Sequence, residues 1–186
     1  MWYLIIQHEW YVHNGNIDFL RHHRAYITGV IDRIDECVDE EGNENLAKQR
    51  FLDWPSSPNQ PGVEAGCRAL LSWALKDAEV LCNLLEEQEH AKKCRAISKR
   101  LKKQIKQPNG LKQAAALMSI AGLMKPEQAC SEVISVDGAK DFSTFYGYYM
   151  LQALAQAGEY QQALDIIRQY WGGMLDLGAT TFWEDF

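Results

Sequence analysis

The amino-acid sequence predicts an all-α fold in which about seven helices are connected as hairpins. Apolar residues recur every three or four positions through most of the chain, and stretches rich in glycine, proline or asparagine separate these periodic segments. No segment shows the strict alternation of a β-strand. The longer predicted helices cover residues 2–13, 17–40, 63–86, 88–106, 111–124, 143–157 and 160–170, and a short helix begins at Pro126.

The first two predicted helices form a hairpin. The helix over 2–13 ends at Gly15, because glycine readily adopts the left-handed conformation that closes a helix. The helix over 17–40 carries isoleucines and valines at helical spacing and stops at Gly42.

Residues 43–62 interrupt the helical pattern. Prolines at positions 55, 58 and 61 exclude a continuous helix, because proline lacks the backbone N–H group that a helix interior needs. A loop of this length in a helical chain is more often functional than accidental. The helix over 63–86 follows, and its wide apolar stripe predicts that it is buried over much of its surface.

The helix over 88–106 is rich in lysine and arginine and ends at Pro108-Asn109-Gly110. Its basic residues form either a phosphate-binding patch or a solvated outer face. No aromatic residues interleave with the basic ones and the apolar stripe is narrow, which favours the outer face.

The last three longer helices raise an alternative function. The helix over 111–124 and the short helix at Pro126 lead to a turn at Asp137-Gly138, and Gly158-Glu159 joins the final hairpin. Ala157-Gly158-Glu159-Tyr160, followed by Ala163, is typical of a tetratricopeptide turn, which would make the protein an adaptor that binds protein partners. Such an array repeats about every 34 residues. The chain shows no convincing repeat at that period, so the adaptor remains the second hypothesis.

Composition restricts the class of protein and of partner. The 186 residues are enough for a single all-α domain spanning 1–186 with a substantial core. The formal net charge of -6 argues against a nucleic-acid partner and favours a carbohydrate or small molecule. Five scattered cysteines without a CxxC pair indicate reduced, buried side chains. The segment after Met1 resembles neither a signal peptide nor a membrane span, and the compartment is not predicted.

Metal and nucleophile chemistry find no support in the sequence. His8 and His13 are five positions apart, which turns them about 140° from each other on a helix, so one metal ion cannot bind both. His22 and His23 are adjacent and also diverge. The chain has no Gly-x-Ser-x-Gly turn and no cysteine in a loop beside a basic partner. We therefore expect no metal and no cofactor.

Carboxylates beside tryptophans are the remaining candidates. Aromatic rings cover the apolar face of a sugar while carboxylates transfer protons. Asp53-Trp54 lies in the proline-rich loop, but Asp53 could instead cap a turn while Trp54 fills the core. Trp183-Glu184 follows a helix that is expected to stop at Gly172-Gly173. Residues 181–184 also fit a capping box, in which a threonine and a glutamate satisfy amides at the start of another helix.

Four stretches carry a likeness to a known family: Phe51-Leu52-Asp53-Trp54-Pro55, Glu64-Ala65-Gly66 before an Ala/Leu-rich helix, residues 143–149 and residues 170–184. They resemble the catalytic domain of bacterial α-L-rhamnosidases, glycoside hydrolase family 78. The likeness extends over nearly the whole chain. Its most specific part is residues 170–184, which we call the closing segment.

The resemblance implies an inverting glycosidase built as an (α/α)6 barrel of six helical hairpins. Glu184 resembles the general base that activates water on the sugar face opposite the leaving group. The resemblance assigns the binding of rhamnose to Asp53, Trp54 and Trp183, with Phe145 and Tyr146 lining the same mouth. In an inverting site the two catalytic carboxyl groups lie roughly 6.5–9.5 Å apart. Another six-hairpin glycosidase with a different sugar specificity is also consistent with these residues.

The chain departs from the family pattern in its extent. A barrel of six hairpins needs about twelve helices, and neither the segment that supplies the general acid nor the helices beyond Glu184 are present in the sequence. We therefore expect an incomplete portion of the catalytic domain. It should expose an apolar seam that favours self-association and should be inactive alone, because a base without its acid cannot protonate the leaving group.

Overall fold

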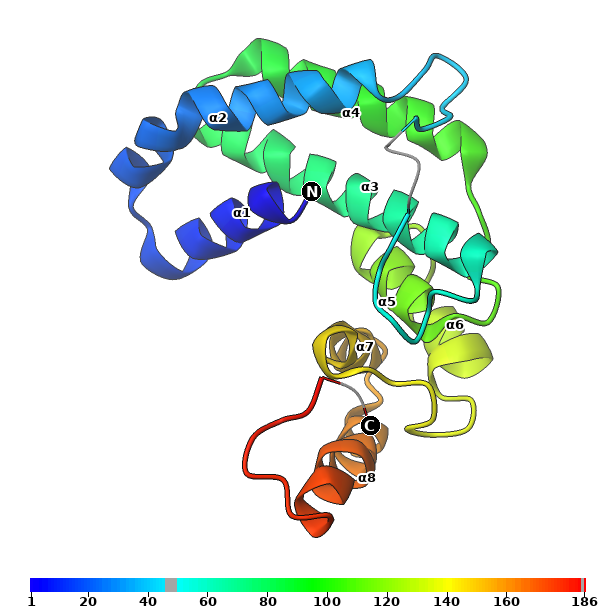
Figure 1. Cartoon of the computed structure of the whole chain (residues 1–186). Helices are drawn as coiled ribbons and strands as arrows, with labels where there is room; N and C mark the ends of the chain where they lie inside the picture. Colours follow the sequence, from blue (N-terminus) through cyan, green and yellow to red (C-terminus); the bar gives the residue numbers. More distant parts are fainter. Residues whose placement is uncertain (46–49, 185) are drawn as a thin grey trace. The chain divides into compact units, whose positions relative to one another are not determined.

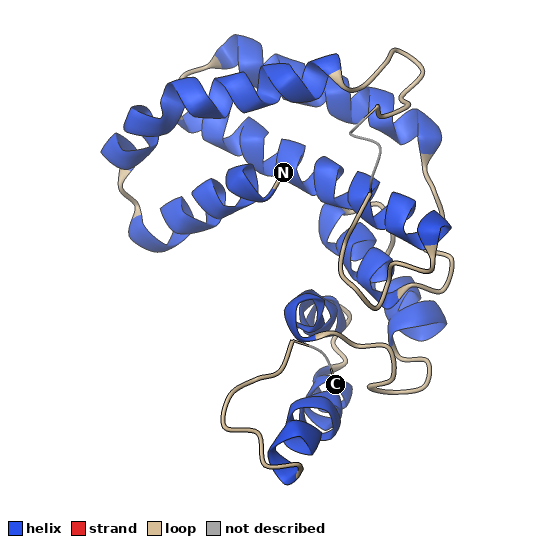
Figure 2. Ribbon diagram, in the orientation of Figure 1, coloured by secondary structure: helices blue, strands red, loops and turns tan. Residues whose placement is uncertain are grey.

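The computed structural model describes residues 1–45, 50–184 and 186, and the predicted all-α class is confirmed. Within these residues no strand is found, and the only β-type pairing is a single bridge between Val38 and Glu44 (Figure 2). The structure assigns eight α-helices to the described residues: α1 Trp2–Asn14, α2 Ile17–Glu36, α3 Gln60–Leu84, α4 Gln88–Leu101, α5 Lys112–Ala121, α6 Pro126–Ala129, α7 Thr144–Gln156 and α8 Tyr160–Asp176. Two short elements, the 3-10 turn η1 Lys102–Gln104 and the π-helical turn η2 Cys130–Ile134, extend α4 and α6.

These helices belong to two compact units that share α3. The first unit consists of Met1–Gln49 and Leu70–Ile105, and the second consists of Arg50–Ala69 and Lys106–Phe186. Residues 46–49 of the predicted loop and residue 185 after the closing segment lie outside the described residues.

The first unit packs α1, α2, α4 and the second part of α3 around an aliphatic core. The buried side chains of α2 and α4 lie at helical spacing, and the two helices run side by side (Figure 1). Trp2 of α1 meets Trp73 of α3 edge to face, with ring centroids 5.9 Å apart. The hydrophobic stripes predicted from the sequence therefore form this core.

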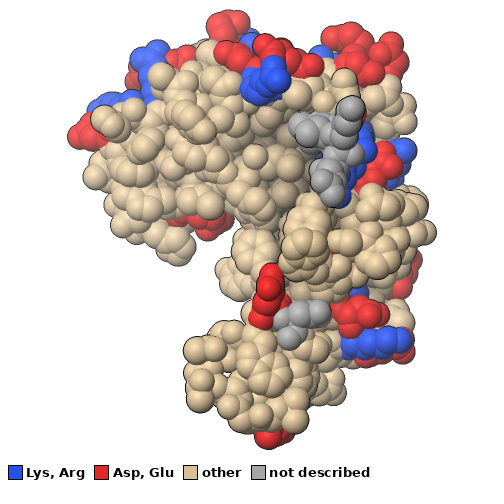
Figure 3. All heavy atoms as spheres, in the orientation of Figure 1, with Lys and Arg blue, Asp and Glu red and all other residues tan. Residues whose placement is uncertain are grey.

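Two basic residues of α4, Lys93 and Arg100, pair with acidic residues of α2. Arg100 forms an ion pair with Asp35, and Lys93 Nζ lies 2.5 Å from Asp32 Oδ1. Figure 3 shows both signs of charge interspersed over α2. Lys92 and Lys99 are exposed, which matches the solvated outer face predicted for this helix, whereas Lys93 and Arg100 are partly buried.

The second unit is organised around α5, whose residues from Lys112 to Ile120 are all buried. It packs against α7, α6 and η2. Lys112 is buried because its ammonium group donates hydrogen bonds to the carbonyl oxygens of Val136 (2.6 Å) and Gly138 (2.7 Å). Burial lowers the pKa of this ammonium group. Gly66 of α3 lies against α5, since a Cβ atom added there would come 3.3 Å from Ala114 Cα.

Several predicted boundaries need correction. The helix predicted over 17–40 ends at Glu36, and the helix predicted over 88–106 ends at Leu101 before η1. The helix predicted from residue 63 begins at Gln60, because the Asn59 side chain accepts a hydrogen bond from the Gly62 amide and caps its first turn.

The prediction that the last helix stops at Gly172-Gly173 is wrong. Helix α8 continues to Asp176, and Gly178 with φ of 86° follows it. A Cβ atom at Gly173 would lie 2.7 Å from Phe186 Cζ, so a glycine there makes room for that ring within a helix. The predicted capping box is also absent, since residues 180–184 are not helical.

All five cysteines are free, and four of them are buried, as expected for reduced apolar side chains. None of the helices in the described ranges is both long and apolar enough to cross a membrane.

Candidate functional site

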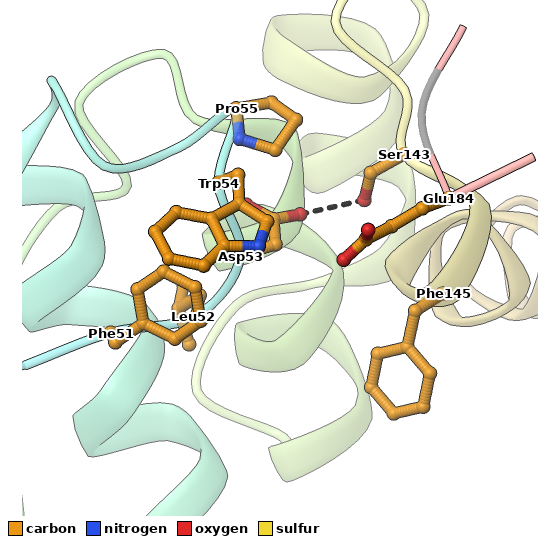
Figure 4. A pocket seen from close by; sticks show the side chains of 8 residues that line it. All are labelled: Phe51, Leu52, Asp53, Trp54, Pro55, Ser143, Phe145 and Glu184. Atoms are coloured by element: carbon orange, nitrogen blue, oxygen red, sulfur yellow. Dashed lines mark hydrogen bonds between the residues drawn. The ribbon is translucent and has the colours of Figure 1, made fainter.

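A pocket of about 260 Å³ lies in the second unit, between the loop after residue 50, the start of α7 and the closing segment (Figure 4). It brings together four of the six residues that the sequence predicts for the site. The residues that line it are Phe51, Leu52, Asp53, Trp54, Pro55, Ser143, Phe145 and Glu184. We call it the Trp54 pocket.

Asp53 is held by three donors. Its Oδ2 atom accepts hydrogen bonds from Ser143 Oγ at 2.6 Å and from Gln113 Nε2 at 3.0 Å. Its Oδ1 atom accepts from the Ser56 amide at 3.0 Å, which closes a turn within the loop. Ser143, Gln113 and Ser56 are all buried, so the carboxylate ties the loop to α5 and to the start of α7.

Ser143 occupies the N-cap position of α7, but its side chain makes no capping hydrogen bond. Its hydroxyl donates to Asp53 instead. The Asp53 carboxylate thereby lies at the N-terminal end of α7, where the helix dipole favours a negative charge. The Asp53 carboxylate thus binds the N-cap residue of α7.

Trp54 projects into solvent next to Asp53. Its side chain is 71% exposed, and Phe51 meets it edge to face with centroids 5.0 Å apart. The alternative prediction was that Asp53 caps a turn while Trp54 fills the core. The first half is confirmed by the hydrogen bond from the Ser56 amide to Asp53, and the second is wrong, because the Trp54 side chain is exposed.

Glu184 is exposed, and in Figure 4 its carboxylate points toward the space beside Asp53. Within the described residues its side chain makes no hydrogen bond or ion pair, so both oxygens are available to a ligand or to water. The Thr144 hydroxyl donates to the Trp183 carbonyl oxygen and connects the segment to α7. One pocket therefore holds one anchored carboxylate and one free carboxylate.

The other predicted site residues lie at different depths. Phe145 is 57% exposed and lines the pocket. Tyr146 is buried beneath the surface and does not line it, and burial raises the pKa of its hydroxyl. The Trp183 ring lies next to Phe186, with centroids 6.1 Å apart, and is not among the lining side chains.

Sequence reasoning missed the supporting role of Ser143 and Gln113. Gln113 is a buried polar residue next to buried Lys112 in an otherwise Ala/Leu-rich helix. A polar pair at the start of such an apolar segment was the available signal, because buried polar groups require partners. The partner itself, 60 residues away, was not predictable from spacing.

No group of three or more His, Cys, Asp or Glu side chains is placed to hold a metal ion among the residues that the structure describes. The side chains that line the Trp54 pocket offer carboxylates, aromatic rings and one hydroxyl. An exposed indole can cover one face of a ring-shaped ligand, Asp53 can accept one more hydrogen bond, and Glu184 can take a proton from water.

Comparison with known proteins adds no assignment: no family model, no curated protein and no solved structure matches the chain. The rhamnosidase family and the six-hairpin barrel therefore stay predictions from the residues quoted above.

Proposed function

We propose that the Trp54 pocket binds a sugar ring and that Glu184 serves as the general base of an inverting glycosidase acting on α-L-rhamnosides. The observation that carries the proposal is the shared pocket of Trp54, Asp53 and Glu184, three residues that the family likeness names for these roles. The choice of rhamnose rests on the family likeness, of which the closing segment is the most specific part.

A sugar-hydrolysing site needs an apolar surface, a fixed hydrogen-bond acceptor and a carboxylate that can bind water, and the three residues supply one each. Trp54 offers an exposed apolar face to the ring carbons. Asp53 is fixed by three hydrogen bonds and is suited to hold a sugar hydroxyl in a constant position. Glu184 has no competing partner among the described residues, so it can orient and deprotonate a water molecule.

A sugar with a good leaving group tests the base without requiring a general acid. We expect the purified chain to hydrolyse α-L-rhamnosyl fluoride, because fluoride departs without protonation, and the first product to be the β anomer. Glu184→Gln should lower this rate about 100-fold or more. Asp176→Asn, which removes an exposed carboxylate outside the pocket, is the control. NMR spectroscopy follows the rate and the anomer together.

Calorimetric titration tests sugar binding separately. Methyl α-L-rhamnoside should bind, and Trp54→Ala should weaken binding about tenfold while the fold is retained, because the indole is exposed. Tyr160→Ala removes an equally exposed ring outside the pocket and should change nothing. Stronger, Trp54-dependent binding of L-mannose or L-fucose would indicate a six-hairpin glycosidase for another sugar. Absence of binding by all three sugars would refute the proposal.

A further inference from the structure

A second hollow adjoins the Trp54 pocket. It has a volume of about 420 Å³ and is lined by Thr144, Phe145, Tyr148, Tyr149 and Glu184. Phe145 and Glu184 line both spaces, so the two are neighbours. We call the second space the Tyr148 hollow.

The aromatic wall of the hollow follows from the helical period of α7. Positions 145, 148 and 149 are three and four residues apart and share one face of the helix. The residues on the other side of α7, such as Gly147, Met150 and Leu154, are buried. The packing of α7 thus fixes the orientation of the three rings.

The rings form a mutually supported cluster that is open to solvent. Tyr149 meets Tyr148 and Phe145 edge to face, with centroids 5.1 Å and 5.8 Å apart. Tyr148 is 64% exposed. The Thr144 hydroxyl donates to the Trp183 carbonyl group, so the three rings make up most of the wall and the Glu184 carboxylate lies at its border. A flat aromatic group suits it better than a second sugar.

The position of Glu184 decides which part of a glycoside can lie there. In an inverting reaction the base and its water occupy the sugar face opposite the leaving group. A hollow bordered by the base therefore lies on the side of the incoming water, away from the leaving group. Its occupant must be carried by one of the ring hydroxyls of the sugar.

We propose that the Tyr148 hollow binds an aromatic acyl group esterified to the sugar that occupies the Trp54 pocket. The substrate class is then an acylated rhamnoside, with Tyr148 as the residue that determines this specificity. This inference rests on the proposed function, because it uses Glu184 as the base.

The test uses methyl α-L-rhamnoside, its 2-, 3- and 4-O-benzoyl esters, and 4-nitrophenyl α-L-rhamnoside, which carries its aromatic ring on the leaving group. One benzoyl ester should bind about three- to tenfold more tightly than the parent sugar. Tyr148→Ala should abolish this gain and leave the affinity for methyl α-L-rhamnoside unchanged. Tyr160→Ala, on an exposed tyrosine outside the hollow, should preserve it.

The outcomes separate the two proposals. If methyl α-L-rhamnoside binds but no ester gains affinity through Tyr148, the inference is wrong and the proposed function stands. If the nitrophenyl group gains affinity through Tyr148 instead, the hollow lies on the leaving-group side and the inference is overturned. If no rhamnoside binds in a Trp54-dependent way, both proposals fail.

Discussion

Asp53 and Glu184 are two carboxylates in one pocket with opposite surroundings. Asp53 lies in a short turn and accepts hydrogen bonds from Ser56, Ser143 and Gln113. Glu184 extends from a non-helical segment and has no such partner among the described residues. A carboxylate that accepts three hydrogen bonds is fixed in position and can accept one more, whereas a carboxylate without partners can exchange a proton with water. This difference is the reason why the proposed function gives sugar binding to Asp53 and the role of base to Glu184.

The largest effect should come from removing the anchored carboxylate. Asp53→Ala leaves the buried donors of Ser143 and Gln113 without their acceptor, so we expect the free energy of unfolding to fall by about 3 kcal/mol. Glu184→Ala is the matched control and should change it by less than about 0.5 kcal/mol, because the side chain is exposed and makes no hydrogen bond or ion pair with the described residues. Urea denaturation measures both. Equal losses in the two variants would remove the contrast between the carboxylates.

A smaller effect is expected from removing one of the three hydrogen bonds to Asp53. Ser143→Ala deletes the 2.6 Å hydrogen bond to Asp53 and should cost about 1.5 kcal/mol, the usual contribution of a bond to a charged group. Because Ser143 makes no capping bond, the loss should report the Asp53 contact and not the start of α7. Asp53→Ala combined with Ser143→Ala should therefore destabilise the protein less than the sum of the single changes. Additive losses in this double-mutant cycle would show that the two groups act independently.

The hydrogen-bond partners of Asp53 could not be predicted from the sequence, whereas the helices could. Helical periodicity located every long helix, because a repeated apolar stripe and a terminal glycine or proline are local signals. The predicted end of α8 is wrong because Gly173 lies inside the helix and leaves space for the Phe186 ring. Helix propensity does not report such a packing contact. Likewise Asp53 and Ser143 are 90 residues apart, and only the fold brings them together.

The contact between α3 and the loop before Asp53 gives a third test. A Cβ atom on Gly66 would lie 2.5 Å from Cδ1 of buried Leu52, so Gly66→Ala should displace the residue next to Asp53. We expect a net loss of about 1 kcal/mol, because overpacking exceeds the gain in helix propensity. Gly29→Ala is the control, since Gly29 lies in α2 with no atom within 4 Å of an added Cβ. It should stabilise the protein by about 0.5–1 kcal/mol. If both variants were stabilised, the close approach at Gly66 would not constrain the loop.

Asp77 in the first unit sharpens the comparison, because it is buried but lacks the donors that Asp53 has. Its Oδ1 atom lies 3.2 Å from His8 Nδ1, and its buried Oδ2 atom has no hydrogen-bond partner among the described residues. Burial raises the pKa of this carboxyl group to about 6, and His8 opposes the rise. The folded chain therefore keeps a proton that the unfolded chain releases between about pH 4 and pH 6, and the free energy of unfolding contributed by this group falls as the pH rises through that window.

Asp77→Asn removes the titrating group, so the free energy of unfolding of the variant should increase relative to that of the unsubstituted chain as the pH rises. Relative to the unsubstituted chain, the variant should gain on the order of 1 kcal/mol of unfolding free energy between pH 4 and pH 7. Urea denaturation of both proteins at these two pH values measures the gain, with Asp176→Asn as a control for removing one negative charge at an exposed position. Parallel pH profiles for the Asp77→Asn variant and the unsubstituted chain would mean that burial does not raise the pKa of Asp77. Burial without donors to Oδ2 would then not disfavour the charged form of the Asp77 carboxyl group.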